Sequence, residues 1–546
     1  MKRRELRGQI VDLHARTVFP GVVEWAGGRI AAIREDARVH ETRLILPGFV
    51  DAHIHIESSL LPPSEFARLA VAHGTVATIS DPHEIANVLG ERGVDYMIRD
   101  GARTPLKFHF GAPSCVPATT FETAGAALDA KAVARLLKRR DVHYLAEVMN
   151  FPGVLGGDPA LRAMIEAAKK LGKPIDGHAP GLRGEQARAY AAAGPSTDHE
   201  CFTLAEAQDK LAAGMKILIR EGSAARNFAV LEPLLKSDAA RVMFCCDDLH
   251  PDLLVGGHLD RHVRRALAGG ADRFDVLRAA SVLPVEHYRM KVGLLRVGDP
   301  ADFIVVDGWK NFRVERTYLD GELVAANGRS RLKRLRAKTP NQFRAQPRVV
   351  TDFAVRPTGG AKLNVIEALN GQLVTRHLRE EPTVRGREFV SDVKRDLLKI
   401  AVVNRYAPRA PVAVGFIRGF GLKGGALASS VAHDSHNIVA VGADDAALTR
   451  AVNLVIKARG GLSVVDRAGR GRVLPLPIAG LMSDRDGRWV AQRYTELDRA
   501  AKKLGSKLDA PFMTLSFMAL LVIPDLKLSD RGLFSATQWG FVPLNQ

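Results

Sequence analysis

The chain has 546 residues, of which 46% are apolar and 25% charged, so it is too long for one ordinary domain and can bury a large core. Its four scattered cysteines are too few for a disulfide framework, which favours a reducing compartment. The basic start lacks an apolar run of signal-peptide length, and no later stretch reaches the roughly 18 apolar residues of a membrane span. We therefore expect a cytoplasmic protein without a membrane partner.

Lysine and arginine outnumber aspartate and glutamate by 78 to 60, a formal charge of +18. This excess raises the hypothesis of nucleic-acid binding, because counterion release drives such binding. Part of it lies in the segment 329–348, which has no aromatic residue apart from Phe343. A solvated linker or a domain-interface helix explains that segment more simply, so we do not expect a nucleic-acid partner.

The first residues, 6–47, are predicted to form short strands, with a hairpin signal at Gly27-Gly28. From 48 to 285 apolar strands alternate with helical segments such as 62–74. Eight such units over about 240 residues have the dimension of a (β/α)8 TIM-like barrel, whose sites lie at the carboxyl ends of its strands. The predicted strands are 48–55, 75–81, 106–112, 142–150, 173–180, 195–200, 215–222 and 241–248.

Strand-and-turn character returns at 299–328, where two Gly-containing pairs signal hairpins. We expect these strands to pair with residues 6–47 in a small composite β-sandwich made by both flanks of the barrel. The last third has its own strands, glycine-rich turns and a helix at 447–460, which is typical of an α+β domain. For this α/β protein we predict a β-sandwich domain of 1–47 and 286–345, a catalytic barrel of 48–285 and a C-terminal domain of 346–546.

Histidines and carboxylates gather at the predicted carboxyl ends of the strands. On the first strand, His53 and His55 point to one face because side chains alternate. This pair alone is a weak signal, but further imidazoles and acids follow at four other strand ends. Four imidazoles and two carboxylates at one barrel mouth can bind two divalent ions, with a bridging carboxylate and a bridging hydroxide. The residues are His53, His55, Glu147, His178, His199 and one of Asp247 and Asp248.

This arrangement resembles the amidohydrolase superfamily, in which many relatives have a carboxylated lysine where this chain has Glu147. Longer strings resemble the adenine deaminase family within it, over about residues 5–540. Two departures are the cysteines of FCCDD, where threonine is expected before the aspartates, and the loosely matching segment 281–293. The strings are HIHIESS, SDPHEIANVLG, AEVMNFPGV, GHAPGL, DHECFTLAEA, IREGSAARN, FCCDDLHPD, GFGLKGGALASSVAHDSHN, LPIAGLMSD and PFMTLSFMAL.

The resemblance implies hydrolysis of adenine to hypoxanthine and ammonia with a pair of Mn²⁺ or Fe²⁺ ions. Imidazole and oxygen donors without a thiolate suit these ions, and they leave Zn²⁺ open. Relatives place the ligand first after the last strand, so we assign Asp247 as the ligand and Asp248 as a candidate helix cap. We hypothesise that a metal-bridging hydroxide attacks C6 and that Asp247 carries its proton to the leaving amine.

The purine nitrogen N1 must be protonated in such a reaction, and the sequence offers several donors. His83 and Glu84, after the second strand, and Glu200, beside His199, are candidates. We favour His83 or Glu84 as the proton-transfer group, whereas Asp81 is expected to set the turn.

Two further groups of polar residues are candidates for substrate binding. After the seventh strand, Arg220, Glu221 and Ser223 can bond to the purine edge, although Arg220 and Glu221 can instead form a local ion pair. A second group in the last domain could close over the barrel mouth, contact a metal or the substrate, be supplied by a partner subunit, or form a solvated turn. It comprises His433, Asp434, His436 and Asn437.

Two alternative functions remain open at this point. A related amidohydrolase acting on an N6-substituted purine or a cyclic amide would share the metal centre and differ only in its pocket. A basic nucleic-acid-binding protein with an inactive metal site is a second alternative, which the intact ligand set argues against. We expect a small-molecule purine substrate and a homo-oligomer.

Overall fold

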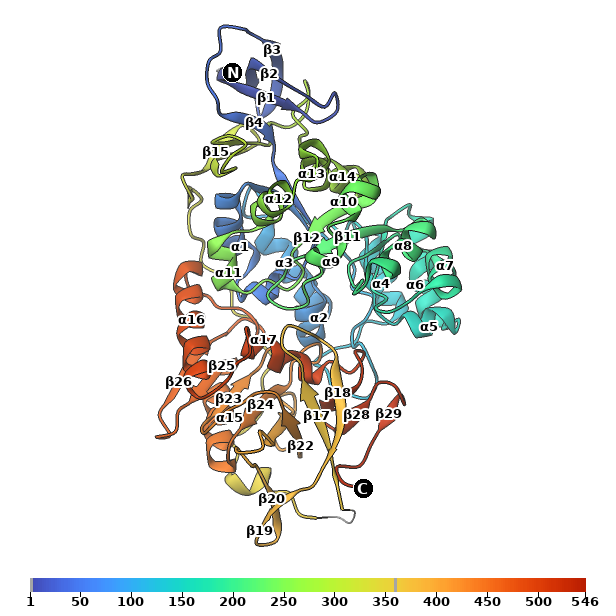
Figure 1. The fold of residues 1–546 in the computed structure, drawn as a ribbon, viewed down its shortest axis with the longest axis vertical. Coiled ribbons are helices and arrows are strands. Elements are labelled where there is room, and N and C mark those ends of the chain that lie inside the picture. The colour runs from blue at the N-terminus through green and yellow to red at the C-terminus, as the bar shows by residue number, and fades with distance from the viewer. Residues whose placement is uncertain (1–2, 358–360) are drawn as a thin grey trace.

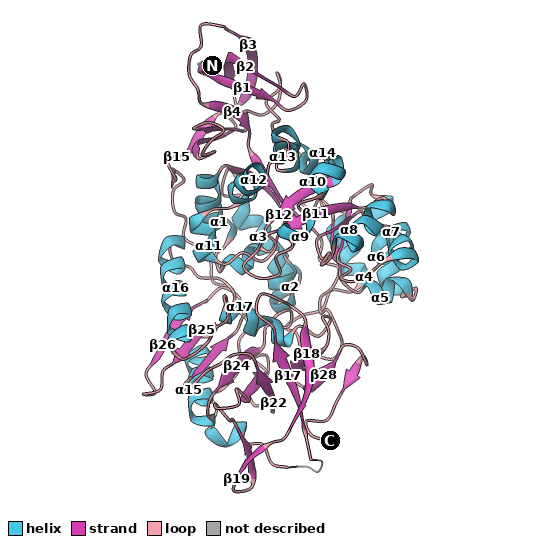
Figure 2. Ribbon diagram, in the orientation of Figure 1, coloured by secondary structure: helices cyan, strands magenta, loops and turns pink. Residues whose placement is uncertain are grey.

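The structure is a computed structural model that describes residues 3–357 and 361–546. A sheet that contains the N-terminal strands lies at one end of the long axis, and the C-terminal third lies at the other (Figure 1). Most helices surround the strands of the middle region (Figure 2). Within the described ranges, no helix combines the length and the apolar character needed to cross a membrane.

All eight strands predicted for the middle region are present. The first three, β5 to β7, form one parallel sheet, and the other five, β8 to β12, form a second. Isolated parallel bridges, Ala112 to Leu145 and Ile54 to Asp247, join the two sheets at both ends. The strands are β5 Phe49–Ile54, β6 Thr75–Ser80, β7 Lys107–Phe110, β8 Leu145–Val148, β9 Ile175–Gly177, β10 Thr197–Asp198, β11 Lys216–Arg220 and β12 Val242–Cys245.

Helices follow most of these strands, and their sequences show why they form. In α6 (Pro159–Lys170), the Asp158 side chain accepts hydrogen bonds from the first-turn amides, and Pro159 occupies the first helical position. Its buried residues, such as Leu161 and Ile165, recur at helical spacing. The other helices here are α1 Pro63–Ala70, α2 His83–Leu89, α3 Glu91–Gly101, α4 Ala130–Leu137, α5 Phe151–Leu155, α7 Gly184–Ala193, α8 Leu204–Ala212, α9 Phe228–Leu231, α10 Leu234–Ser237, α11 Pro251–Gly256, α12 Leu259–Ala268, α13 Arg273–Ala279 and α14 Val282–His287.

The flanks of the middle region share one eight-stranded sheet, in the order β16-β15-β14-β13-β4-β1-β2-β3. The junction is β4, which pairs parallel to β1 and antiparallel to β13. Trp25 packs edge-on against Phe303 and Tyr318 in its core, so residues from both flanks are buried together. The strands are β1 Arg4–Asp12, β2 Thr17–Ala26, β3 Arg29–Glu35, β4 Leu44–Pro47, β13 Phe303–Val306, β14 Val314–Leu319, β15 Glu322–Ala326 and β16 Arg329–Ser330.

The C-terminal third is built on a second eight-stranded sheet, β18-β17-β22-β21-β24-β23-β25-β26, with smaller sheets β19-β20 and β27-β28-β29. The predicted helix is α15 (Asp445–Ala458), which starts two residues early because the Asp444 side chain caps it. The other elements are β17 Leu363–Ala368, β18 Thr375–Glu380, β19 Thr383–Arg385, β20 Glu388–Val390, β21 Leu398–Val403, β22 Val412–Arg418, β23 Ala426–Ser429, β24 Ile438–Gly442, β25 Gly461–Val465, β26 Gly471–Pro475, α16 Gly487–Lys503, α17 Pro511–Ser516, β27 Leu526–Ser529, β28 Gly532–Ser535 and β29 Gly540–Phe541.

The C-terminal third packs directly on the middle region. Gly487, at the start of α16, donates its backbone N–H to Glu65 of α1, and Ser483 donates to the backbone of Leu60. The basic segment from 331 to 349 contains no helix and runs between these parts, with Phe343 buried. It is therefore an ordered linker, and the alternative of an interface helix is wrong.

Candidate active site

The six predicted metal ligands converge from the carboxyl ends of five strands, and none of them is more than 5% exposed. His53 and His55 come from the end of β5, and their Nε2 atoms lie 3.2 Å apart. The His53 ring also stacks on that of His199, with centroids 4.2 Å apart. The alternation of side chains along β5 therefore places both imidazoles on one face, as predicted.

Glu147, at the end of β8, is at the centre of this cluster. Its Oε2 accepts a 2.8 Å hydrogen bond from Nδ1 of His178 and lies 3.3 Å from Nε2 of His199. Its Oε1 lies 3.2 Å from Nε2 of His55. Burial alone would raise the pKa of Glu147, but His178, His199 and His55 hold it well below its usual range. The carboxylate thus spans the two groups of histidines, which is the position predicted for a bridge.

Asp247 faces the histidines of β5 from the end of β12. Its Oδ1 lies 3.1 Å from Nε2 of His55 and 3.5 Å from Nε2 of His53, and its Oδ2 accepts a hydrogen bond from Arg220. Its backbone N–H donates to the carbonyl of His53, which fixes it beside β5. Burial opposes ionisation, yet Arg220 and the two histidines lower the pKa of Asp247 well below its ordinary value.

The donor set fits divalent cations. Groups of donor atoms that all lie within 4.8 Å of one another include His53–His55–Asp247 and His53–Glu147–His199, which share His53. The separations of 3.1–3.5 Å among the first group are those of neighbouring ligands around one ion with bonds of about 2.1 Å. The donors are imidazole nitrogens and carboxylate oxygens, the types preferred by first-row divalent metals.

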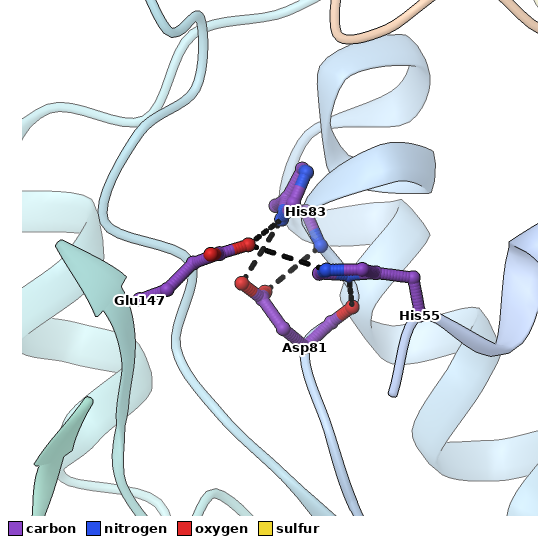
Figure 3. A group of neighbouring side chains, drawn as sticks. All are labelled: His55, Asp81, His83 and Glu147. Atoms are coloured by element: carbon purple, nitrogen blue, oxygen red, sulfur yellow. Dashed lines mark hydrogen bonds and ion pairs between the residues drawn. The ribbon is translucent and has the colours of Figure 1, made fainter. Parts of the chain in front are cut away.

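A third group of donors extends the cluster to α2. Figure 3 shows His83 and Asp81 meeting Glu147 and His55, with His83 Nδ1 3.4 Å from Glu147 Oε1. Asp81 accepts from the backbone N–H of His83, which confirms its predicted part in the turn, and also from Nδ1 of that ring at 2.9 Å. His83 therefore borders the predicted metal ligands and is held there by Asp81.

Glu84 connects the part of the cluster that lies in the middle region to the C-terminal third. Its carboxylate contacts His433 and His436 and lies 3.4 Å from Nε2 of His83. His433 stacks on Phe517, with ring centroids 4.8 Å apart. Burial opposes protonation of His433, but the charge of Glu84 raises its pKa to about 9.

Four polar residues predicted in the C-terminal third are all buried, which excludes the alternative of a solvated turn. Asp434 lies 3.8 Å from Nε2 of His83, so it borders the cluster together with His433 and His436. Asn437 has a different place, because it donates to the backbone of Thr123 and accepts from that of Arg405. Its polar atoms therefore connect two loops.

The predicted binding residues at the end of β11 also differ in whether they reach the cluster. Arg220 is buried and donates to both Glu200 and Asp247. Glu221 lies 3.1 Å from Arg265 on α12, so the alternative of an Arg220–Glu221 pair is wrong. Ser223 accepts the backbone N–H of His250. Neither Glu221 nor Ser223 reaches the cluster through the polar contacts of the described residues.

Two acids at the edge of the cluster have contacts that the sequence did not indicate, and one of them, Glu57, was not predicted as a site residue. Asp248 accepts from Ser58 and caps no helix, so that expectation is wrong. Glu57 accepts the backbone N–H of Ile85 at 3.2 Å, and burial raises its pKa to about 7. Glu57 and Ser58 lie two and three residues after His55 in HIHIESS, and this proximity was the available signal.

Comparisons with known proteins show the family of the chain. The Amidohydrolase family profile matches residues 44–324, and that of the Adenine deaminase C-terminal domain matches 372–539. An adenine deaminase of Salinibacter ruber is 58% identical over 98% of both chains, and one of Sulfurovum sp. is 55% identical over 98% of this chain and 99% of its own.

A further relative, an adenine deaminase of Borreliella burgdorferi, is 45% identical over 98% of this chain and 99% of its own. Among solved structures, an N-acetyl-D-glucosamine-6-phosphate deacetylase from Mycobacterium smegmatis covers 59% of this chain and 99% of its own, at 17% identity and a TM-score of 0.46. The relatives span nearly the full chain, and both family profiles match. The chain therefore belongs to the adenine deaminase family of the amidohydrolase superfamily.

Proposed function

We propose that the protein hydrolyses adenine to hypoxanthine and ammonia. One observation carries this proposal: Glu147 is contacted by imidazoles from three strands, while Asp247 faces the two imidazoles of β5 and is paired with Arg220. A central carboxylate and an opposite aspartate suit hydrolysis assisted by two metal ions. Membership of the adenine deaminase family supports adenine as the substrate.

We propose that β5 to β12 close into one (β/α)8 barrel, supported by the two bridges that join its sheets. The barrel would span 48–285, flanked by the composite β-sandwich of 1–47 and 286–345 and followed by the C-terminal α+β domain of 346–546. The ligand cluster then lies at the carboxyl ends of the strands, where sites of this fold form. We also propose a cytoplasmic homo-oligomer.

Two Mn²⁺ or Fe²⁺ ions fit the donor set, and ligand type leaves Zn²⁺ open. His53, His55 and Asp247 would hold one ion, His178 and His199 the other, and Glu147 would bridge them. When bound, the ions supply a hydroxide near neutral pH and polarise the reacting carbon.

The side chains around the ions handle the protons. Asp247 would accept the proton of the attacking water and deliver it to the leaving amine, and Arg220 keeps this carboxylate ionised beforehand. We further propose that His83 and Glu84 move a proton to purine N1, which is supported by the position of His83 between Glu147 and Glu84. His433, Asp434 and His436 border the same space and would contact the purine edge.

An ammonia-release assay together with metal analysis tests this proposal. We expect release from adenine to exceed release from 6-methylaminopurine and from a hydantoin-like amide. Glu147→Gln should lose metal and at least about a thousandfold in kcat, because the bridge loses its charge. A protein that holds both ions and frees no ammonia from adenine would refute the proposed function. A Glu147→Gln variant with both metals and full rate would refute the bridge.

A further inference from the structure

A cavity of about 310 Å³ lies where the loops of three middle strands meet the C-terminal third. Phe151, Pro180 and Phe202 line it from the loops after β8, β9 and β10. Val522 and Trp539 line it from the C-terminal side. Its walls are thus mainly aromatic and aliphatic, and both parts of the chain contribute to them.

A proposed metal ligand precedes each of these cavity-lining segments in the chain, inside β8 for Glu147 and directly after β9 and β10 for His178 and His199. Met149 lies two residues after Glu147, Pro180 two after His178, and Phe202 three after His199, and all three residues line the cavity. The cavity is therefore separated from the ligand cluster by only one or two residues of each loop.

Hydrogen bonds connect the loops after β8 and β9 to each other. The hydroxyl of Tyr190 donates to the carbonyl of Val148 at 2.7 Å and accepts the backbone N–H of His178 at 3.1 Å. Ser114 donates to the carbonyl of Glu147 at 2.5 Å. Because the same backbone carries the ligands and the cavity wall, the cavity keeps a fixed position relative to the cluster.

A substrate must pass buried side chains to reach this cluster, since each of the six ligands is at most 5% exposed. His178 is the most exposed of them, and its loop continues into the cavity wall. A small pocket with aromatic walls suits one flat heterocycle, because rings stack on rings and the volume is at the lower end for small-molecule sites.

We propose that this cavity is the vestibule through which the purine base reaches the metal cluster, with Phe151, Phe202 and Trp539 holding the ring. The inference rests on the proposed function for its substrate class, a free purine base. The vestibule sets the affinity for that base and leaves the chemical step to the cluster.

Two substitutions test the vestibule by steady-state kinetics on the metal-loaded full chain. Trp539→Ala removes one wall, and KM for adenine should rise about tenfold with kcat within twofold. Ala536→Trp fills the cavity and should lower kcat/KM at least tenfold with unchanged metal content. Trp489→Ala is the matched control, because Trp489 is as exposed as Trp539 but lies on α16 outside the cavity.

Tryptophan fluorescence gives a readout that does not depend on turnover, since the chain has only four tryptophans. Adenine should quench the wild-type emission, and Trp539→Ala, but not Trp489→Ala, should lose the quench. Wild-type KM in both cavity variants, or a quench that survives Trp539→Ala, would overturn the vestibule while deamination stands. A wild-type protein that shows the quench but frees no ammonia would keep the vestibule and refute the proposed function.

Discussion

The buried Arg220 predicts the largest single effect on stability around the site. Its guanidinium donates to Glu200 and Asp247, and all three groups are at least 95% buried. Arg220→Met leaves two buried carboxylates without their arginine partner, and breaking a buried pair in this way costs about 3–5 kcal/mol. At about 2–4 °C per kcal/mol for a unit of 150–250 residues, the metal-free protein should lose about 6–20 °C in Tm.

The assay compares Tm by circular dichroism in metal-free protein with and without Glu200→Gln. Adding Glu200→Gln to Arg220→Met should restore part of the loss, because it removes one of the two unpaired charges. Arg183→Met is the matched control, because Arg183 is half exposed and pairs with Asp209, a contact worth at most about 1 kcal/mol. If Arg220→Met cost no more than Arg183→Met, the account of a buried charge network would be refuted.

Other predictions concern the C-terminal third and the residue that precedes β5. Burial lowers the pKa of Lys527 to about 7, against about 10.4 in the unfolded chain. Between these two pH values the unfolded chain binds more protons than the folded one. The free energy of unfolding therefore rises with pH by roughly 4–5 kcal/mol across this window. Lys527→Met should abolish this rise in urea titrations at pH 7 and 10. Gly48→Ala would place a Cβ 2.2 Å from Cγ1 of Val76 and should cost at least about 1–3 kcal/mol by urea unfolding. His433→Phe loses the contact with Glu84, and kcat/KM for adenine should fall about tenfold or more with metal content unchanged.

Each of these has its own control. In Gly256→Ala the added Cβ meets no atom within 4 Å, so this variant should be at least as stable as the wild type. An equal loss of stability in both glycine variants would contradict the steric argument. A pH slope that persists in Lys527→Met would show that other groups cause it. The His433→Phe ring keeps the stacking on Phe517, so full activity in that variant would remove His433 from the substrate site.

The strands, and the meeting of histidine and acid side chains at their carboxyl ends, could be predicted because short-range rules determine them. Because side chains alternate along β5, His53 and His55 point to the same face. Parallel strands then bring their carboxyl ends to one edge. The direction of Glu221 could not be predicted, because it depends on Arg265, 44 residues later in the chain. Asp248 follows Asp247 directly, yet only the tertiary structure shows that Ser58 is its partner. Such choices depend on long-range neighbours, and no local pattern encodes them.

The position of β4 has a consequence for synthesis of the chain. Leu44 of β4 pairs with Val306 of β13. During translation this edge of β4 therefore has no partner until the whole middle region has been synthesised. At about 5–20 residues per second this wait is on the order of 10–50 s. Throughout it a short apolar strand edge is open to wrong partners, including the same strand of a neighbouring nascent chain. Protection of that edge by a chaperone during elongation therefore bears directly on the yield of native protein.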